Sequence, residues 1–118
     1  MAQLAKDSQP ALAALAFAQA LVGGEFAKAH AMLSVDARAS TSAQDLSERY
    51  SEMISWAEEP VTECEVEVID DDMPDMRPDE VAWTYLNLFG EGFCEGVTLL
   101  VVDEQGKLAI RIAEWGRP

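Results

Sequence analysis

The strongest constraint on the fold is a change in the spacing of apolar residues at Pro60. Before it, apolar side chains recur every three or four residues, which is typical of helices. After it, glutamates alternate with apolar residues, as in a strand with one wet and one buried face. The glutamates are Glu63, Glu65 and Glu67, and their neighbours on the buried side are Cys64, Val66 and Val68. Because proline stops a helix, the order of helices then strands predicts an α+β domain.

Three helices are predicted before this break. The first has Pro10 in its first turn and runs to about Val22, where two glycines end it. The second starts near Glu25, and the third starts after Ser42, with Asp45 placed as in a weaker relative of the capping box. Their apolar stripes are Phe26, Ala29, His30 and Leu33 in the second helix, and Leu46, Tyr50, Met53, Ile54 and Ala57 in the third.

Four strands are predicted after the break, at residues 61–69, 81–89, 93–102 and 107–115. The connections are short or rich in turn residues, except for the acidic loop 70–78. We therefore predict three N-terminal helices packed on a four-stranded antiparallel sheet. The 118 residues form a single domain with an ordered core at about 10–115.

The strand at 81–89 is apolar on both faces, and helices cover only one face of an antiparallel sheet. The simplest cover for the second face in so short a chain is another copy of the protein. The sequence therefore predicts a homodimer formed through the sheet.

The chain has 22 acidic and 8 basic residues and a formal charge of -14, which disfavours nucleic acids and anionic membranes as partners. Eleven of the acidic residues lie between positions 58 and 80, beside a single base. This stretch serves either solubility or a basic protein partner. The predicted acidic partner surface consists of Glu63, Glu65, Glu67, Asp70, Asp71 and Asp72.

Other signals are weak. The apolar run 11–22 after Lys6 is a poor match to a signal peptide, so we expect a cytoplasmic protein. Cys64 and Cys94 show no metal-ligand spacing and are expected to be reduced packing residues. The loop 70–75 lacks the glycine and final glutamate of an EF-hand, and we expect no metal or cofactor.

Residues 20–34, ALVGGEFAKAHAMLS, resemble a segment of the nuclear transport factor 2-like superfamily: a helix followed by Gly-x-[Phe/Tyr]-x-x-Ala-x-x-Leu-Leu-Ser. The capped helix from Ser42 and the last strand, with residues 110–115, are also similar to that family. The resemblance implies a sheet curved into a cone, a mouth that holds a small apolar ligand, and dimerisation through the outer face. The family contains isomerases, dehydratases, epoxide hydrolases and cyclases, and also binding, transport and toxin-immunity proteins without catalysis.

The candidate site residues are those that could line such a cone: His30, Tyr50, Trp56, Tyr85 and Arg111. His30 is the one histidine and Tyr50 a possible hydrogen-bond donor, so these two are the weak candidates for catalysis. Each also has a structural explanation, as a core side chain. Arg111 could pair with Glu95 or bind a ligand carboxylate.

Three functions follow from these observations. The leading prediction is a non-catalytic protein that binds a small apolar molecule or a protein. The first alternative is an enzyme of the isomerase, dehydratase or cyclase kind, and the second is an acidic immunity-type inhibitor of a basic toxin.

Overall fold

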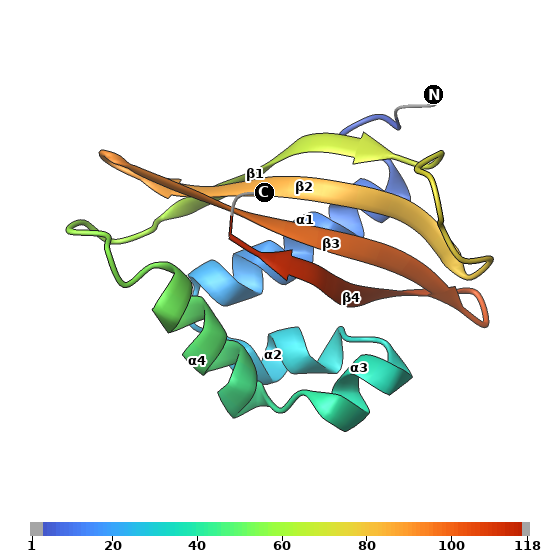
Figure 1. The fold of residues 1–118 in the computed structure, drawn as a ribbon, viewed down its shortest axis with the longest axis horizontal. Coiled ribbons are helices and arrows are strands. Elements are labelled where there is room, and N and C mark those ends of the chain that lie inside the picture. The colour runs from blue at the N-terminus through green and yellow to red at the C-terminus, as the bar shows by residue number, and fades with distance from the viewer. Residues whose placement is uncertain (1–3, 117–118) are drawn as a thin grey trace.

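The structure, a computed structural model, describes residues 4–116. Four helices come first and four strands follow (Figure 1). The helices are α1 (Gln9–Val22), α2 (Phe26–Ala31), α3 (Val35–Ser40) and α4 (Ala43–Met53). The strands are β1 (Glu63–Asp70), β2 (Glu80–Gly90), β3 (Phe93–Glu104) and β4 (Lys107–Trp115). The α+β class and the four-stranded antiparallel sheet are confirmed, but the prediction of three helices is wrong.

The helix that the sequence pattern missed is α3. Its N-cap is Ser34, whose Oγ accepts a hydrogen bond from the N–H of Ala37 at 3.3 Å. The carboxylate of Glu104 accepts from the N–H of Val35 at 3.1 Å and so ties α3 to the end of β3. None of the six residues of α3 is buried, so the helix has no apolar stripe that could have revealed it.

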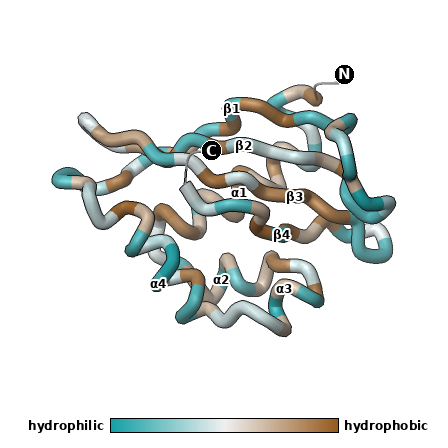
Figure 2. Tube along the Cα trace, in the orientation of Figure 1, coloured by the Kyte–Doolittle hydropathy of each residue, from teal (hydrophilic) through white to brown (hydrophobic). Residues whose placement is uncertain are grey.

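The core lies between α1 and one face of the sheet. Alanines and Phe17 from α1 are fully buried, and the small side chains allow the helix to approach the strands closely. Figure 1 shows α1 behind the sheet and the other three helices gathered beside β4. Hydrophobic segments concentrate in the strands, with hydrophilic turns at the sheet ends (Figure 2). Within residues 4–116, no helix is long and apolar enough to cross a membrane.

The strands follow one another in the order β1-β2-β3-β4, so β1 and β4 are the two edges of the sheet. The turn between β3 and β4 consists of Gln105 and Gly106, which both have positive φ (57° and 86°). A two-residue hairpin turn of this kind requires that conformation, and glycine adopts it without strain.

Bulges in the two edge strands change which of their side chains face the helices. In β1 the register shifts at Glu67, so Val68 pairs with Tyr85 on the outer face and Ile69 pairs with Thr84 on the core face. The predicted alternation is therefore wrong for Val68, because a bulge inserts one extra residue and reverses the faces beyond it. In β4 the extra residue is Ala113.

The outer face of the sheet is partly covered by the chain itself. Loop residues Met73 and Met76 line a hollow together with Trp83 and Leu100 of the outer face. Val102, which also faces outward, is 0% exposed. A second copy is therefore not needed to cover this end of the sheet, contrary to the argument from the sequence.

Candidate functional site

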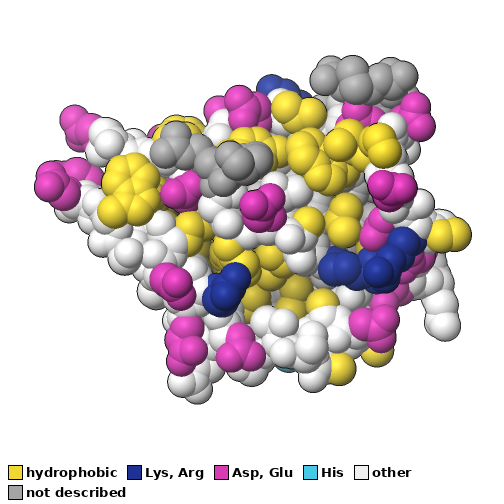
Figure 3. All heavy atoms as spheres, in the orientation of Figure 1, with side chains coloured by type: hydrophobic (Ala, Val, Ile, Leu, Met, Phe, Trp, Pro, Cys, Tyr) yellow, Lys and Arg dark blue, Asp and Glu magenta, His cyan; other side chains and the backbone are white. Residues whose placement is uncertain are grey.

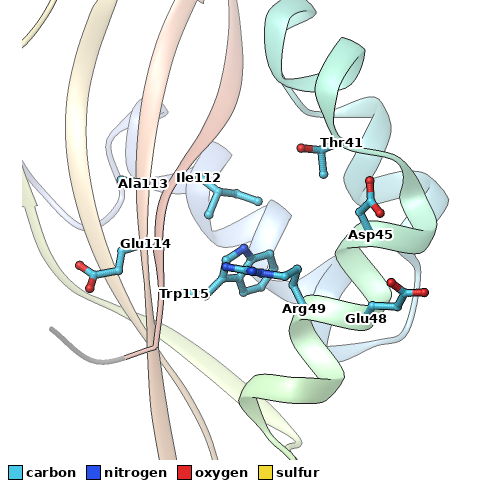
Figure 4. A pocket seen from close by; sticks show the side chains of 8 residues that line it. All are labelled: Thr41, Asp45, Glu48, Arg49, Ile112, Ala113, Glu114 and Trp115. Atoms are coloured by element: carbon cyan, nitrogen blue, oxygen red, sulfur yellow. The ribbon is translucent and has the colours of Figure 1, made fainter.

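A groove lies between α4 and the second half of β4 (Figure 4). It has a volume of 560 Å³ and is lined by Thr41, Asp45, Glu48, Arg49, Ile112, Ala113, Glu114 and Trp115. We call it the α4–β4 groove. Its helical wall is fixed by a capping box, in which the Oγ of Ser42 accepts from the N–H of Asp45 at 3.0 Å and the Asp45 carboxylate accepts from the N–H of Ser42 at 2.9 Å.

The groove continues at both ends along the edge of the sheet. Toward α3 it shares Thr41 and Ile112 with a hollow of 240 Å³, and toward the end of α4 it shares Arg49 and Trp115 with a hollow of 290 Å³. The space-filling view shows hydrophobic side chains at the bottom of this hollowed region and acidic side chains around it (Figure 3). The three hollows therefore form an elongated surface that follows β4.

The apolar floor of the groove depends on the bulge in β4. Ile112 pairs with Leu99 and Trp115 pairs with Val97, while Glu114 pairs with Thr98. Figure 4 shows the side chains of Ile112 and Trp115 pointing toward α4 and that of Glu114 pointing away. Without the extra residue Ala113, strict alternation would put Ile112 and Glu114 on the same face, so the bulge is what brings Trp115 into the groove.

Acidic side chains outnumber bases along the three hollows. The acids are Asp36, Asp45, Glu48, Glu52, Glu95 and Glu114, and the bases are Arg49 and Arg111. Arg111 forms salt bridges with Glu80 at 3.0 Å and Asp79 at 3.2 Å. Within residues 4–116, Arg49 makes no salt bridge. The lining is therefore net acidic.

An exposed tryptophan marks the end of the groove beyond α4. Trp56 is 53% exposed, and its ring packs against Phe93 with the centroids 4.2 Å apart. Its Nε1 donates to the Oε2 of Glu95 at 3.4 Å. Large aromatic side chains held in this way are common at protein interfaces.

The two residues predicted for catalysis are not brought together. Tyr50 is 6% exposed and packs against Phe26, with ring centroids 5.9 Å apart. Burial, with a smaller contribution from Cys64, raises the pKa of Tyr50. Within residues 4–116, His30 makes no hydrogen bond through its side chain and lines none of the hollows described above. A base and a donor converging on one cavity are therefore not found.

The other predicted pocket residues have different positions. Tyr85 lies on the outer face of the sheet and pairs with Thr98. Its ring lies over Gly96, so a side chain at position 96 would collide with it. Trp56 and Arg111 line the hollows at the two ends of the groove. The pairing of Arg111 with Glu95 is wrong, because Arg111 faces outward from β4 and binds Glu80 and Asp79 instead.

The predicted acidic surface loses one member. Asp70 is the last residue of β1 and is 2% exposed, and its Oδ1 accepts from the N–H of Asp72 at 2.7 Å. It is buried because the following loop folds over the outer face. The remaining members are exposed: Glu63, Glu65, Glu67, Asp71 and Asp72.

Cys64 and Cys94 are free, and they lie on opposite faces of the sheet. In the described part of the chain, no group of three His, Cys, Asp or Glu residues is placed to hold a metal ion. The sequence analysis missed the floor and helical wall of the groove, because α4 and β4 lie far apart in the sequence. Alternation also gave no sign of the bulge.

No protein-family model matches this chain, and no curated protein or solved structure matches it either.

Proposed function

We propose that this chain is a non-catalytic binding protein that holds a basic segment of a protein partner in the α4–β4 groove. The observation that carries the proposal is an open, elongated groove with Ile112 and Trp115 on its floor and an excess of carboxylates along its length. An apolar floor gives affinity through burial, and the acidic lining favours a cationic occupant.

The shape of the groove favours a polypeptide over a small apolar molecule. Small-molecule sites bury most of the ligand surface in an enclosed cleft. The groove instead lies open along the edge of the sheet and runs on into smaller hollows (Figure 3). A linear segment can use all three hollows, whereas a compact ligand would remain exposed on one side.

The same observations weigh against an enzyme of the isomerase, dehydratase or cyclase kind. His30 and Tyr50 do not converge, and the ring of Tyr50 is buried against Phe26. A toxin-immunity role remains a form of the present proposal, since a basic toxin would be one such partner. The order of helices followed by a four-stranded meander supports membership of the nuclear transport factor 2-like superfamily and its cone fold.

We also propose that two copies associate through the part of the outer sheet face that the loop after β1 does not line. This part carries no formal charge on β2 and β3, although the chain as a whole has a charge of -14. Its outward-facing side chains are Tyr85, Asn87, Phe89, Cys94 and Thr98. Sedimentation is expected to show a dimer at micromolar concentration, and Asn87→Arg should shift it to the monomer because it places two like charges at the interface. A wild-type monomer would refute this proposal.

The groove is tested with a defined probe, an acetylated and amidated octapeptide of four Lys-Val repeats. Adding it to the 15N-labelled protein is expected to shift the amide resonances of Ile112, Ala113 and Trp115. Raising the salt concentration should weaken the binding, since the attraction is partly electrostatic. If resonances elsewhere move and those of the groove do not, the proposal fails.

Two charge-reversed variants separate the groove from the overall charge. Glu48→Lys with Glu52→Lys changes two exposed residues that line the groove and its extension. Glu63→Lys with Glu65→Lys makes the same change in net charge on exposed residues of β1. The first variant should bind the octapeptide about tenfold or more weakly than the second, at a cost of about 0.7 kcal/mol or more per substitution. Equal losses would show that only net charge matters.

A further inference from the structure

The free edge of β4 is divided into a paired half and an unpaired half. At Ile110 the N–H donates to the carbonyl of Met32 at 2.9 Å, and the carbonyl accepts from the N–H of Ser34 at 2.8 Å. These two bonds form a short parallel bridge between Leu33 and Ile110. The chain therefore already adds one short strand segment to this edge.

The direction of the next backbone groups follows from the antiparallel pattern. Opposite residues alternate between pairs that exchange hydrogen bonds and pairs that do not. Since Ile110 directs its N–H and C=O away from β3, Arg111 directs its groups toward Leu100, and Ile112 again directs them outward. Outside the strand ladders, no backbone group of residues 4–116 bonds to the N–H or the carbonyl of Ile112.

The outward side of Ile112 is the α4–β4 groove. Ile112 lines both the groove and the hollow beside α3. The chain turns away into α3 immediately after Ser34. Residues 32–34 therefore pair with β4 beside Ile110, and the segment does not continue as a strand beside Ile112. Edge strands with unpaired N–H and C=O groups are templates for an added strand, and charged or covered edges prevent this.

We propose that the basic segment binds as an added strand, which pairs its main chain with Ile112 at the edge of β4 and extends the track of residues 32–34. This inference rests on the proposed function and names the binding mode of the same groove. The occupant is an extended cationic polypeptide: main-chain hydrogen bonds hold it to Ile112, and its lysines or arginines meet the carboxylates of Glu48 and Glu52. Alternate apolar side chains would contact the floor formed by Ile112 and Trp115.

Hydrogen exchange of the Ile112 amide tests the pairing directly. In the free protein this amide should exchange quickly, whereas the amide of Ile110, which is bonded to Met32, should exchange slowly. With the Lys-Val octapeptide at about ten times its dissociation constant, exchange at Ile112 should slow about tenfold, because only the bound state protects it. Exchange at Ile110 serves as the internal reference.

A second measurement uses N-methylated peptides. Two octapeptides carry the same sequence, one methylated on the amides of its valines and the other on the amides of its lysines. Only one of the two sets points toward β4 in an added strand, so one peptide should bind about tenfold or more weakly than the other. Each peptide is the matched control for the other, and the folding of the protein is not disturbed.

The outcomes separate the two proposals. If the octapeptide shifts the groove resonances but leaves Ile112 exchange unchanged, or if both methylated peptides bind equally, the added strand is refuted and the groove remains a binding site. If no groove resonance shifts, the proposed function itself fails. If the protein alone protects Ile112 as its concentration rises, a second copy occupies the edge, and the proposal of a basic partner strand is overturned.

Discussion

The two edges of the sheet, β1 and β4, have the same place in the topology but very different surroundings. β1 presents exposed Glu63, Glu65 and Glu67 to solvent, and a bulge interrupts its register at Glu67. Each edge has a short backbone contact: the N–H of Leu4 donates to the carbonyl of Ile69 on β1, and Ile110 of β4 bonds to residues 32–34. Only β4 has the helices α3 and α4 beside it.

The difference shows two treatments of a sheet edge: exposed charge with a bulge at β1, and helices alongside the strand at β4. Rows of charge and bulges on an edge strand oppose pairing with another chain. The edge of β4 instead has helices beside it, and the proposed added strand would lie between this edge and α4. The following predictions test this contrast.

The largest effect is expected from removing the charges of the β1 edge. Glu63→Thr with Glu65→Thr replaces two exposed glutamates by residues that favour strands. We expect species larger than those of the wild type in sedimentation at high protein concentration, because the edge is no longer protected. Glu48→Thr with Glu52→Thr has the same net charge and should behave like the wild type. If both variants associate equally, the edge does not explain the effect.

The two edges should also differ in how much they contribute to stability. Ile110 is 1% exposed and lies between β3 and the segment at Leu33, so Ile110→Ala should lower the free energy of unfolding by about 3 kcal/mol. Cys64 on the β1 edge is half-buried, and Cys64→Ala should cost about 1 kcal/mol. Urea denaturation measures both. Equal losses of unfolding free energy in Ile110→Ala and Cys64→Ala would mean that the two edges are equally integrated into the core.

A third contrast concerns the two arginines near β4. Arg111 pairs with Glu80, whose side chain is only 6% exposed, so Arg111→Met should destabilise the protein by about 2 kcal/mol. Asp79 is 46% exposed and adds little to this value. Arg49→Met, at an exposed residue of the groove without a salt bridge in the described chain, should change stability by less than about 0.5 kcal/mol. Thermal unfolding of the two variants checks the ranking.

The smallest effect is a loss of stability at alkaline pH. Burial raises the pKa of the Cys64 thiol, so the folded state holds this proton more tightly than the unfolded state. The resulting stabilisation is complete below the unfolded pKa of about 8.5 and is lost as the pH rises through the higher folded pKa. Cys64→Ala should therefore reduce the loss of stability between neutral and alkaline pH, measured by urea denaturation. The control is Cys94→Ala, at an exposed residue, and an identical pH dependence in Cys64→Ala and wild type would contradict the prediction.

Much of the fold could be predicted because the decisive signals are local. The last strand begins and ends where the sequence placed it, at Lys107–Trp115, and the capping residues Ser42 and Asp45 mark the start of α4. Hydrophobic period and capping depend on neighbours within a few residues. The helix α3 was not predicted because it has no apolar stripe. A polar cap and a hydrogen bond to the distant Glu104 hold it in place instead.

The candidate site was much harder to predict. Trp56 and Arg111 were identified as pocket residues and do line hollows at the ends of the groove. Ile112 and Trp115 were not, because strict alternation would have put Ile112 and Glu114 on one face. His30 and Tyr50 share apolar stripes in the sequence, but a stripe shows only that a side chain faces inward, and not what it meets there.

The sequence by itself determined the α+β order, the antiparallel meander and the acidic edge at Glu63 and Glu65, since these depend on residue type and spacing along the chain. Only the tertiary structure decided that residues 73–77 lie over the outer face, that Ala113 forms a bulge and that α4 lies beside β4. These features depend on pairings between residues far apart in the chain, whose energies are set by packing after the strands have met. The groove exists because of those pairings.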